Sequence, residues 1–274
     1  MTPRWIDLHL HTFFSDGTFT PEEVIRRARE VGLAAVSITD HDTLAGIPAA
    51  RKTAGGSLEI ISGVELTVAF RNRELHVLGF GFREEDPALN AFLGDARSRR
   101  LDRIQSMIDR LNERGVPVTL REVQAAAGQG DSIGRPHLAE VLLKKRVVQT
   151  LPEAFDRFIG DRAPCFVKQA TLTVPQAAQL IRGAGGVTVL AHPHHMVEDE
   201  WIPELVAQGI QGIEAYHPDH NPSVAELYRR MAEALNLLIS GGSDCHGLRK
   251  LGGPFIGSVQ VPYRYLERMK ASFS

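Results

Sequence analysis

The chain has 274 residues, of which 43% are hydrophobic and 23% are charged, with a formal net charge of −2. This ordinary globular composition excludes the basic field that binds long nucleic acid, and no apolar run approaches the roughly 20 residues that span a membrane. With two cysteines, Cys165 and Cys245, and no apolar signal-peptide core at its start, the chain is expected to be a cytoplasmic protein without a disulfide framework or a membrane partner.

Short strand-like runs alternate with helix-like stretches along the chain. After the first run comes TPEEVIRRAREV, in which Thr20 is an N-cap candidate, Pro21 opens the first turn and Gly32 follows the end. Two further amphipathic helices are predicted at residues 175–183 and 221–235. The predicted strands are Trp5–Leu10, Ala35–Thr39, Ile60–Val68, Leu75–Phe82, Pro164–Val167, Val187–Leu190, Gly212–Ala215 and Leu237–Ser240. This alternation favours a parallel β/α architecture.

One region breaks the alternation, because residues 86–161 contain almost no strand-like pattern. Helices are predicted there at Asp86–Gly115, Leu120–Ala127, Arg135–Lys145 and Pro152–Ile159. We therefore expect a barrel-like domain formed by residues 1–85 and 162–274. Residues 86–161 would be a helical insertion that covers the functional site.

Histidine and carboxylate side chains gather where the predicted strands end. His9 and His11 close the first strand, and a spacing of two places both imidazoles on one face of it. The other candidates at or near strand ends are Asp16, His41, Glu65, His76, His192, Asp244 and His246. The carboxyl ends of parallel barrel strands share one face, where active sites lie, so these groups would meet in one cavity. Imidazoles and carboxylates without thiolates suit zinc, manganese or iron, and suit magnesium less well.

Five motifs in chain order, DLHLHTFFSDG, ITDHDT, GVELT, AHP and GGSDCHG, resemble those of the PHP (polymerase and histidinol phosphatase) superfamily. The resemblance implies an α/β fold, a distorted seven-stranded β/α barrel, with a site for two to three divalent ions. It implies one ion held by His9, His11, Glu65 and Asp244, a second by Glu65, His76 and His192, and a third by Asp16, His41 and His246. Some members have histidine at the position of Asp16, and the harder carboxylate tilts the third site toward manganese or magnesium. Manganese is the expected cofactor, with zinc, iron and magnesium as alternatives.

Clustered divalent ions lower the pKa of bound water and neutralise phosphoryl charge, so the expected reaction is attack of a metal-bridging hydroxide on a phosphate ester. The residues expected to act directly in it are Asp16, His41, Glu65 and Asp244. The proton donor to the leaving group is open between His194 and a metal-bound water. Cys245 lies between two candidate ligands, and on an extended path its side chain faces away from theirs, so it is not expected to bind metal.

The predicted insertion offers a second anion site in the segment GQGDSIGRPHLAEVL. A glycine-rich backbone before a helix start presents N–H groups to anions, and Arg135 can hold a phosphate through two parallel hydrogen bonds. Ser132 and His137 flank Arg135, and Lys168 follows a predicted strand that could point into the same cavity. Taken alone, the segment is also explained as a plain loop and helix start. The segment AYHPDH adds two candidates to line a substrate pocket, Tyr216 and His220.

The insertion, with GRPHLA and AYHPDH, resembles one PHP branch, the nucleoside 3',5'-bisphosphate phosphatases and related 5'-3' exonucleases of short RNA. The resemblance implies that the 5'-phosphate is held by Ser132, Arg135, His137 and Lys168. The metals would then release the 3'-phosphate and leave the 5'-monophosphate, and a short 5'-phosphorylated oligonucleotide would fit the same site. Three alternatives stay open: a histidinol-phosphate-type phosphomonoesterase, which leaves Arg135 and Lys168 unexplained, an amidohydrolase, and a non-catalytic PHP module.

Overall fold

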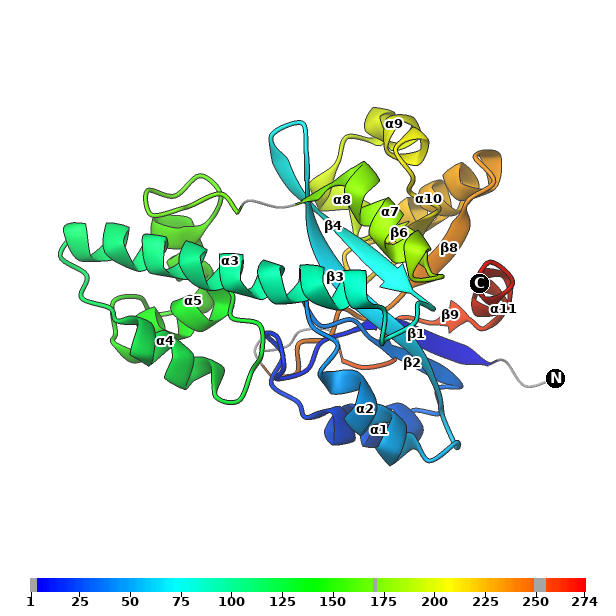
Figure 1. Ribbon diagram of the computed structural model, residues 1–274, viewed down its shortest axis with the longest axis horizontal. Coiled ribbons are helices and arrows are strands. Elements are labelled where there is room, and N and C mark those ends of the chain that lie inside the picture. The colour runs from blue at the N-terminus through cyan, green and yellow to red at the C-terminus, as the bar shows by residue number, and fades with distance from the viewer. Residues whose placement is uncertain (1–3, 170–171, 249–254) are drawn as a thin grey trace.

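The computed structural model describes residues 4–169, 172–248 and 255–274. Its strands are β1 (Trp5–Leu10), β2 (Ala35–Ile38), β3 (Glu59–Phe70), β4 (Arg73–Phe80), β5 (Leu172–Thr173), β6 (Val187–Leu190), β7 (Gly212–Tyr216), β8 (Leu238–Gly241) and β9 (Val261–Pro262). They form one sheet in the order β8-β7-β6-β4-β3-β2-β1-β9, and β5 pairs with β3. The sheet curls into a nearly closed barrel (Figure 1), in which Leu10 at the end of β1 bridges to Cys245 after β8. Without the two-residue strands β5 and β9, the described part of the chain has the seven barrel strands that the family resemblance implied.

Strand β4 departs from the parallel arrangement that the sequence pattern favours. It runs antiparallel to both of its neighbours, β3 and β6. A two-residue turn causes the reversal, because Arg71 and Asn72 adopt φ values of 44° and 64°, as type I′ hairpin turns require. The hairpin register pairs Thr67 with His76. His76, near the start of β4, therefore lies at the same end of the barrel as Glu65.

The helices and single turns are α1 (Pro21–Glu30), α2 (Gly46–Ala54), α3 (Pro87–Glu113), α4 (Leu120–Ala127), α5 (Arg135–Lys144), α6 (Leu151–Ala154), η1 (Phe155–Ile159), α7 (Val174–Gly183), α8 (Pro193–Met196), η2 (Asp199–Trp201), α9 (Ile202–Ala207), α10 (Pro222–Ala234) and α11 (Arg264–Lys270). The predicted start of α1 is confirmed. The amide of Glu23 donates to Thr20 Oγ1 at 3.2 Å, and the amide of Thr20 donates to Glu23 Oε2 at 2.8 Å. The helix then stops before Gly32, which has a φ of 75°.

The strand predicted at residues 164–167 is wrong. This segment turns instead, since the Phe166 amide donates to the carbonyl of Ala163 at 3.1 Å. Its last carbonyl, that of Val167, accepts from Arg103 Nε at 2.7 Å. Helix α3 therefore supplies the hydrogen bond that a neighbouring strand would have supplied.

Helices α3, α4 and α5 extend from one side of the barrel (Figure 1). They share a hydrophobic cluster of their own, which includes Ile104, Leu111, Val123 and Leu138. Buried ion pairs dock α3 onto the barrel: Arg100 Nε lies 2.5 Å from Asp42 Oδ2, and Arg103 Nη2 lies 3.2 Å from Glu74 Oε2. The insertion thus lies against the loops at the carboxyl ends of β2 and β3. The division of the chain into domains at residues 86 and 161 stays a prediction.

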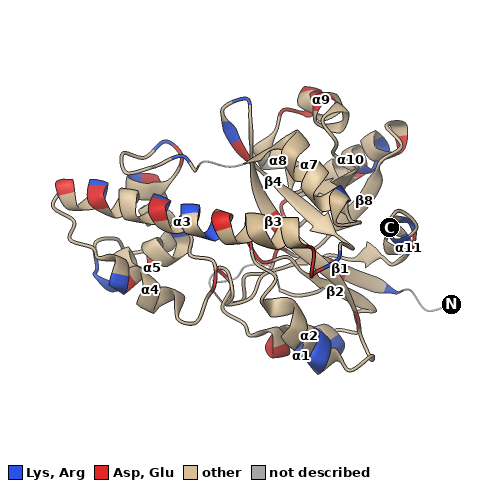
Figure 2. Cartoon of the chain, viewed as in Figure 1, with Lys and Arg blue, Asp and Glu red and all other residues tan. Residues whose placement is uncertain are grey.

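Acidic and basic side chains are interspersed over the elements of the molecule, and both signs occur along α3 (Figure 2). Among the described residues, no helix is both long and apolar enough to cross a lipid bilayer.

Candidate metal centre

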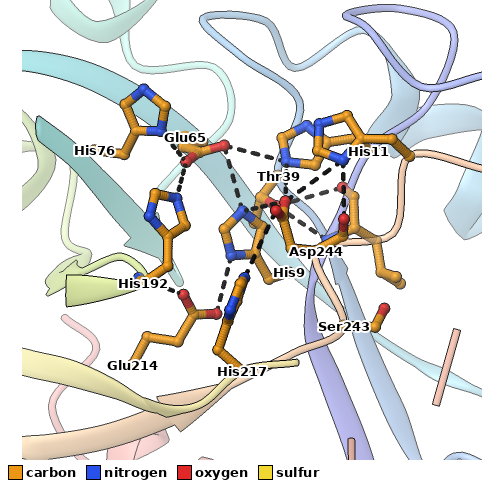
Figure 3. A network of polar contacts seen from close by, with 12 residues as sticks. His9, His11, Thr39, Glu65, His76, His192, Glu214, His217, Ser243 and Asp244 are labelled. Atoms are coloured by element: carbon orange, nitrogen blue, oxygen red, sulfur yellow. Dashed lines mark hydrogen bonds and ion pairs between the residues drawn. The ribbon is translucent and has the colours of Figure 1, made fainter. Parts of the chain in front are cut away.

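Glu65 lies at the centre of a cluster of imidazoles at the carboxyl end of the barrel (Figure 3). Its side chain is 1% exposed, and both of its oxygens face histidines. Oε1 lies 2.7 Å from His76 Nδ1 and 3.1 Å from His192 Nε2. Oε2 lies 3.1 Å from His11 Nε2, 3.3 Å from His9 Nε2 and 3.3 Å from His41 Nδ1. The strands thus bring together side chains that are far apart in the sequence.

Two further carboxylates extend the cluster. Asp244 Oδ1 lies 3.3 Å from His9 Nε2 and 3.2 Å from His11 Nε2. Asp16 Oδ1 lies 3.3 Å from His246 Nε2, and its Oδ2 lies 3.8 Å from His41 Nε2. The structure therefore places all nine predicted ligands in one continuous cluster: His9, His11, Asp16, His41, Glu65, His76, His192, Asp244 and His246.

The residues present fit divalent ions. Three groups offer ligand atoms that all lie within 4.8 Å of one another: His11, Asp16, His41 and His246; His9, His11 and Asp244; and His9, Glu65 and His192. Within the described part of the chain, the buried nitrogens His11 Nε2, His41 Nδ1 and His76 Nδ1 have no hydrogen-bond partner, although carboxylate oxygens lie close to them. A buried polar atom without a partner is costly, and an ion between nitrogen and oxygen removes that cost.

The charges of the cluster shift its pKa values in opposite directions. Burial alone would raise the pKa of Glu65, but the facing imidazoles of His41, His76 and His9 hold it well below its usual value. Burial disfavours the charged form of His11, yet the close carboxylates of Asp244 and Glu65 raise its pKa to about 10. Burial holds the pKa of His41 well below its usual value, although the nearby carboxylates of Glu65 and Asp16 raise it. The cluster is therefore strongly polarised, with ionised carboxylates at its centre.

Local backbone structure holds these loops in place. Asp40, buried after β2, accepts hydrogen bonds from the Thr12 amide at 2.7 Å and from Ser15 Oγ at 2.6 Å, and so fixes the loop that carries Asp16. Two candidate ligands have left-handed backbone angles, His192 with a φ of 25° and Asp244 with a φ of 48°. Such strain in non-glycine residues persists only where surrounding contacts hold it, and it is common at functional sites.

The phosphate-binding candidates lie where the insertion meets the barrel. Ser132 is buried, and its Oγ has no hydrogen-bond partner among the described residues. Arg135 Nη1 lies 2.6 Å from Asp161 Oδ1, and His137 Nδ1 accepts from the Gly134 amide at 3.1 Å. Lys168 lines a cavity of about 310 Å³, whose other walls include Asp161 and Phe166. The ring of Phe166 also lies 5.4 Å from the Arg135 guanidinium.

The remaining candidates are Tyr216, His220 and His194. Tyr216 Oη lies 3.2 Å from Tyr265 Oη on α11, and burial followed by this contact raises the pKa of Tyr216 to about 12. His220 Nδ1 donates to the carbonyl of Ala215 at 3.0 Å. The exposed ring of His194 stands edge-on to that of His220, with 5.9 Å between centroids. The His220 ring also lies 5.4 Å from that of His217 and 5.1 Å from that of Tyr228 on α10, between centroids. The predicted roles of Tyr216, His220 and His194 stay predictions.

Sequence reasoning missed three buried residues at the site. Glu214 on β7 lies 2.9 Å from His9 Nδ1, and His217 Nε2 lies 3.6 Å from Asp244 Oδ2 (Figure 3). Arg100 of α3 contacts Asp42 beside His41. A glutamate inside the apolar strand GIEAY was the available signal for the first of these. For Arg100, the signal was an arginine at every third position, 97, 100 and 103, on a helix predicted to cover the site.

The fold and the cluster define a metal-dependent phosphoesterase, and comparison with known proteins gives its family. The PHP domain matches residues 7–154, and the chain belongs to this family. It is 32% identical to the 5'-3' exoribonuclease Rnm of Escherichia coli, over 88% of this chain and 84% of that protein. It is 31% identical to a 3',5'-nucleoside bisphosphate phosphatase of Chromobacterium violaceum, over 93% and 91%. A phosphoribosyl 1,2-cyclic phosphate 1,2-diphosphodiesterase of Eggerthella lenta is also 31% identical, over 88% and 94%.

Solved structures with a similar fold support the assignment to this family. A Bifidobacterium adolescentis protein assigned to the metal-dependent phosphoesterases superposes with a TM-score of 0.90 at 30% identity, covering 99% of this chain and 98% of that one. A Chromobacterium violaceum structure named an amidohydrolase, with bound sulfate and no metal, superposes with a TM-score of 0.88 at 28% identity, over 98% and 97%. The predicted PHP-type barrel is therefore confirmed.

Proposed function

We propose that the protein removes the 3'-phosphate of nucleoside 3',5'-bisphosphates, such as adenosine 3',5'-bisphosphate, and leaves the 5'-monophosphate. One observation carries the proposal. The amides of Asp131 and Ser132 both donate to the carbonyl of Phe14 at 2.8 Å, two residues before Asp16. The anion-binding candidates of the insertion are thus tied to the loop that carries a candidate metal ligand. In this proposal, a small substrate with two phosphates reaches both sites at once.

The proposed centre holds two to three divalent ions, manganese before zinc, iron or magnesium. The proposed ligands are His9, His11, Glu65 and Asp244 for the first ion, Glu65, His76 and His192 for the second, and Asp16, His41 and His246 for the third. Such ions, when bound, lower the pKa of water and neutralise charge on a phosphoryl group. The protein contributes the fixed positions of the ligands, because they stand on strand ends and are buried.

The insertion binds the other phosphate in this proposal. Arg135 is the first residue of helix α5, and in this proposal its guanidinium holds the phosphate. The Asp161 carboxylate now paired with Arg135 is 70% exposed and can yield its place to a phosphate. Ser132 Oγ is a donor without a partner among the described residues, and Lys168 adds charge from the neighbouring cavity wall. His137 donates from Nε2, since its Nδ1 accepts the Gly134 amide.

Short 5'-phosphorylated oligonucleotides are the second proposed substrates. Their terminal nucleotide presents the same 5'-phosphate, and a 3'-phosphodiester replaces the monoester at the metal centre. The relative named an exoribonuclease favours this extension. Interspersed surface charge and a net charge of −2 favour small substrates over long nucleic acid. His194 is the proposed side-chain source of the proton for the leaving group.

The test is phosphate release with manganese supplied, from adenosine 3',5'-bisphosphate, 5'-AMP, 3'-AMP and histidinol phosphate in parallel. Selective conversion of the bisphosphate to 5'-AMP is the expected result. Equal hydrolysis of all four esters would keep the metal centre and reject the second phosphate site. No hydrolysis by protein that has bound manganese would reject the bisphosphate proposal. Oligonucleotides with and without a 5'-phosphate, and then amide substrates, would be assayed next.

A further inference from the structure

Glu214 contacts two candidate ligands that serve different ions in the proposed centre. It is fully buried on β7, and it is not itself among the predicted ligands. Its Oε1 lies 2.9 Å from His9 Nδ1, and its Oε2 accepts the backbone N–H of His192 at 2.7 Å. Figure 3 shows the carboxylate between these two histidines, on the side away from Glu65. His9 is assigned to the first ion and His192 to the second.

The contact with His9 decides which imidazole nitrogen can bind a metal. An ionised carboxylate only accepts hydrogen bonds, so His9 Nδ1 must carry a proton and donate to Glu214. His9 Nε2 then presents its lone pair toward Glu65 and Asp244, each at 3.3 Å. A metal-binding histidine needs this tautomer, and a carboxylate partner commonly sets it.

The contact with His192 acts on the backbone. His192 has a φ of 25° and a ψ of 60°, a strained conformation for a residue with a side chain. The hydrogen bond from its amide to Glu214 is short and helps to hold that conformation. The His192 ring is thereby directed toward Glu65, with Nε2 3.1 Å from Oε1.

We propose that Glu214 is a positioning residue that couples the first and second metal sites, because one carboxylate sets the tautomer of His9 and the backbone of His192. The proposal rests on the metal assignment of the proposed function. It makes a specific claim beyond that assignment: loss of Glu214 weakens these two sites together. In the described part of the chain, Glu214 does not contact Asp16, His41 or His246, so the site that these three form is expected to keep its affinity.

Glu214→Gln is the sharpest variant, because it preserves size and changes one oxygen to NH2. The His192 amide can only donate, so the remaining oxygen has to stay there and the NH2 faces His9. His9 Nδ1 must then accept, and its proton moves to Nε2, the atom that would bind the ion. Glu226→Gln on α10 is the matched control, since Glu226 is partly exposed and pairs with Arg229 and Arg230.

The measurement is manganese binding by equilibrium dialysis, with the bound metal counted by mass spectrometry. In Glu214→Gln, two of the wild-type sites should lose about 10- to 100-fold in affinity together, and any remaining site should be unchanged. The control should bind as the wild type does. Unchanged binding, or loss at one site only, would overturn the coupling. Wild-type protein that binds fewer than two ions would instead overturn the metal centre itself.

A measurement on the wild type keeps the proposal testable if the variant does not fold. Zinc serves as a diamagnetic probe, and histidine labelled with ¹⁵N reports the protonation of each ring nitrogen by NMR. In the zinc-loaded protein, His9 should carry its proton on Nδ1 and should bind through Nε2. A proton on His9 Nε2 would contradict the role assigned to Glu214.

Discussion

The metal cluster and the phosphate-binding candidates of the insertion meet at Phe14, but they are built differently. The residues of the cluster lie at or near strand ends and are held by buried contacts, such as those from Glu65 to His11 and His192, each at 3.1 Å. The insertion offers helix starts and loops, where Arg135 pairs with an exposed carboxylate. Rigid strand ends fix a geometry before a ligand arrives, whereas an exposed ion pair can open for one.

This structural difference suits two roles: the metal cluster carries out the reaction, and the insertion selects the substrate. Relatives of about equal identity are named for an RNA, a nucleoside bisphosphate and a cyclic phosphate, although all of them act on phosphate esters. A shared buried cluster can supply the common chemistry, and the more exposed insertion can vary the substrate. Damage to the cluster should therefore affect every substrate equally, and damage to the insertion should affect only substrates with a second phosphate.

The largest effect is expected for Glu65→Gln. The change removes the charge that faces five imidazoles, so both metal binding and phosphoryl stabilisation should suffer. We expect kcat/KM to fall at least about 10³-fold, by the same factor for adenosine 3',5'-bisphosphate and for 3'-AMP. Steady-state kinetics and metal counts check this, with Glu226→Gln as the control. A fall in kcat/KM for the bisphosphate alone would contradict the assignment of the reaction to the cluster and of substrate selection to the insertion.

Arg135→Ala should separate the substrates. A charged hydrogen-bonding group on a phosphate contributes about 1.5–3 kcal/mol, so kcat/KM for the bisphosphate should fall about 10- to 100-fold. Turnover of 3'-AMP, which lacks the 5'-phosphate, should change little. Arg157→Ala is the matched control, because Arg157 also lies in the insertion and pairs with Glu153. Equal losses on both substrates would remove the second phosphate site from the proposal.

The two regions also differ in how far the sequence predicted them. The candidate ligands follow from local patterns: a spacing of two in His9 and His11, and polar residues directly after apolar runs. A strand end positions such residues whatever their distant neighbours are. The helices of the insertion also depend on local contacts: in the structure, Thr119 and Glu122 form a capping box at the start of α4.

What the sequence could not predict depends on long-range contacts. Arg100 meets Asp42 across 58 positions, and nothing local pairs an arginine on a helix with a loop after a strand. Glu214 resembles any strand residue until His9, 205 positions away, lies beside it. The reversal of β4 was missed because its turn is formed by Arg71 and Asn72 without glycine, the usual signal of a hairpin.

Cys245→Ala is expected to be structural only. The thiol lies between two candidate ligands in sequence, but it packs in the hydrophobic cluster with Leu10 and Ile38, and its Sγ accepts from the Gly247 amide at 3.4 Å. Removal of the sulfur should cost about 1–2 kcal/mol in the free energy of unfolding. Metal content should be unchanged, and urea unfolding with a metal count checks both points. Loss of a bound ion in this variant would show instead that the Cys245 thiolate is a metal ligand.

The smallest effect is expected for Asp161→Asn. The Asp161 carboxylate forms an ion pair with the Arg135 guanidinium, and a substrate phosphate would have to displace it. Exposed ion pairs of this kind contribute about 0.2–1 kcal/mol, so releasing Arg135 should lower KM for the bisphosphate by up to about fivefold and leave 3'-AMP kinetics unchanged. A rise in KM for the bisphosphate would show that Asp161 orients Arg135 for binding. The insertion would then be preorganised in the same way as the metal cluster, and the contrast between the two regions would disappear.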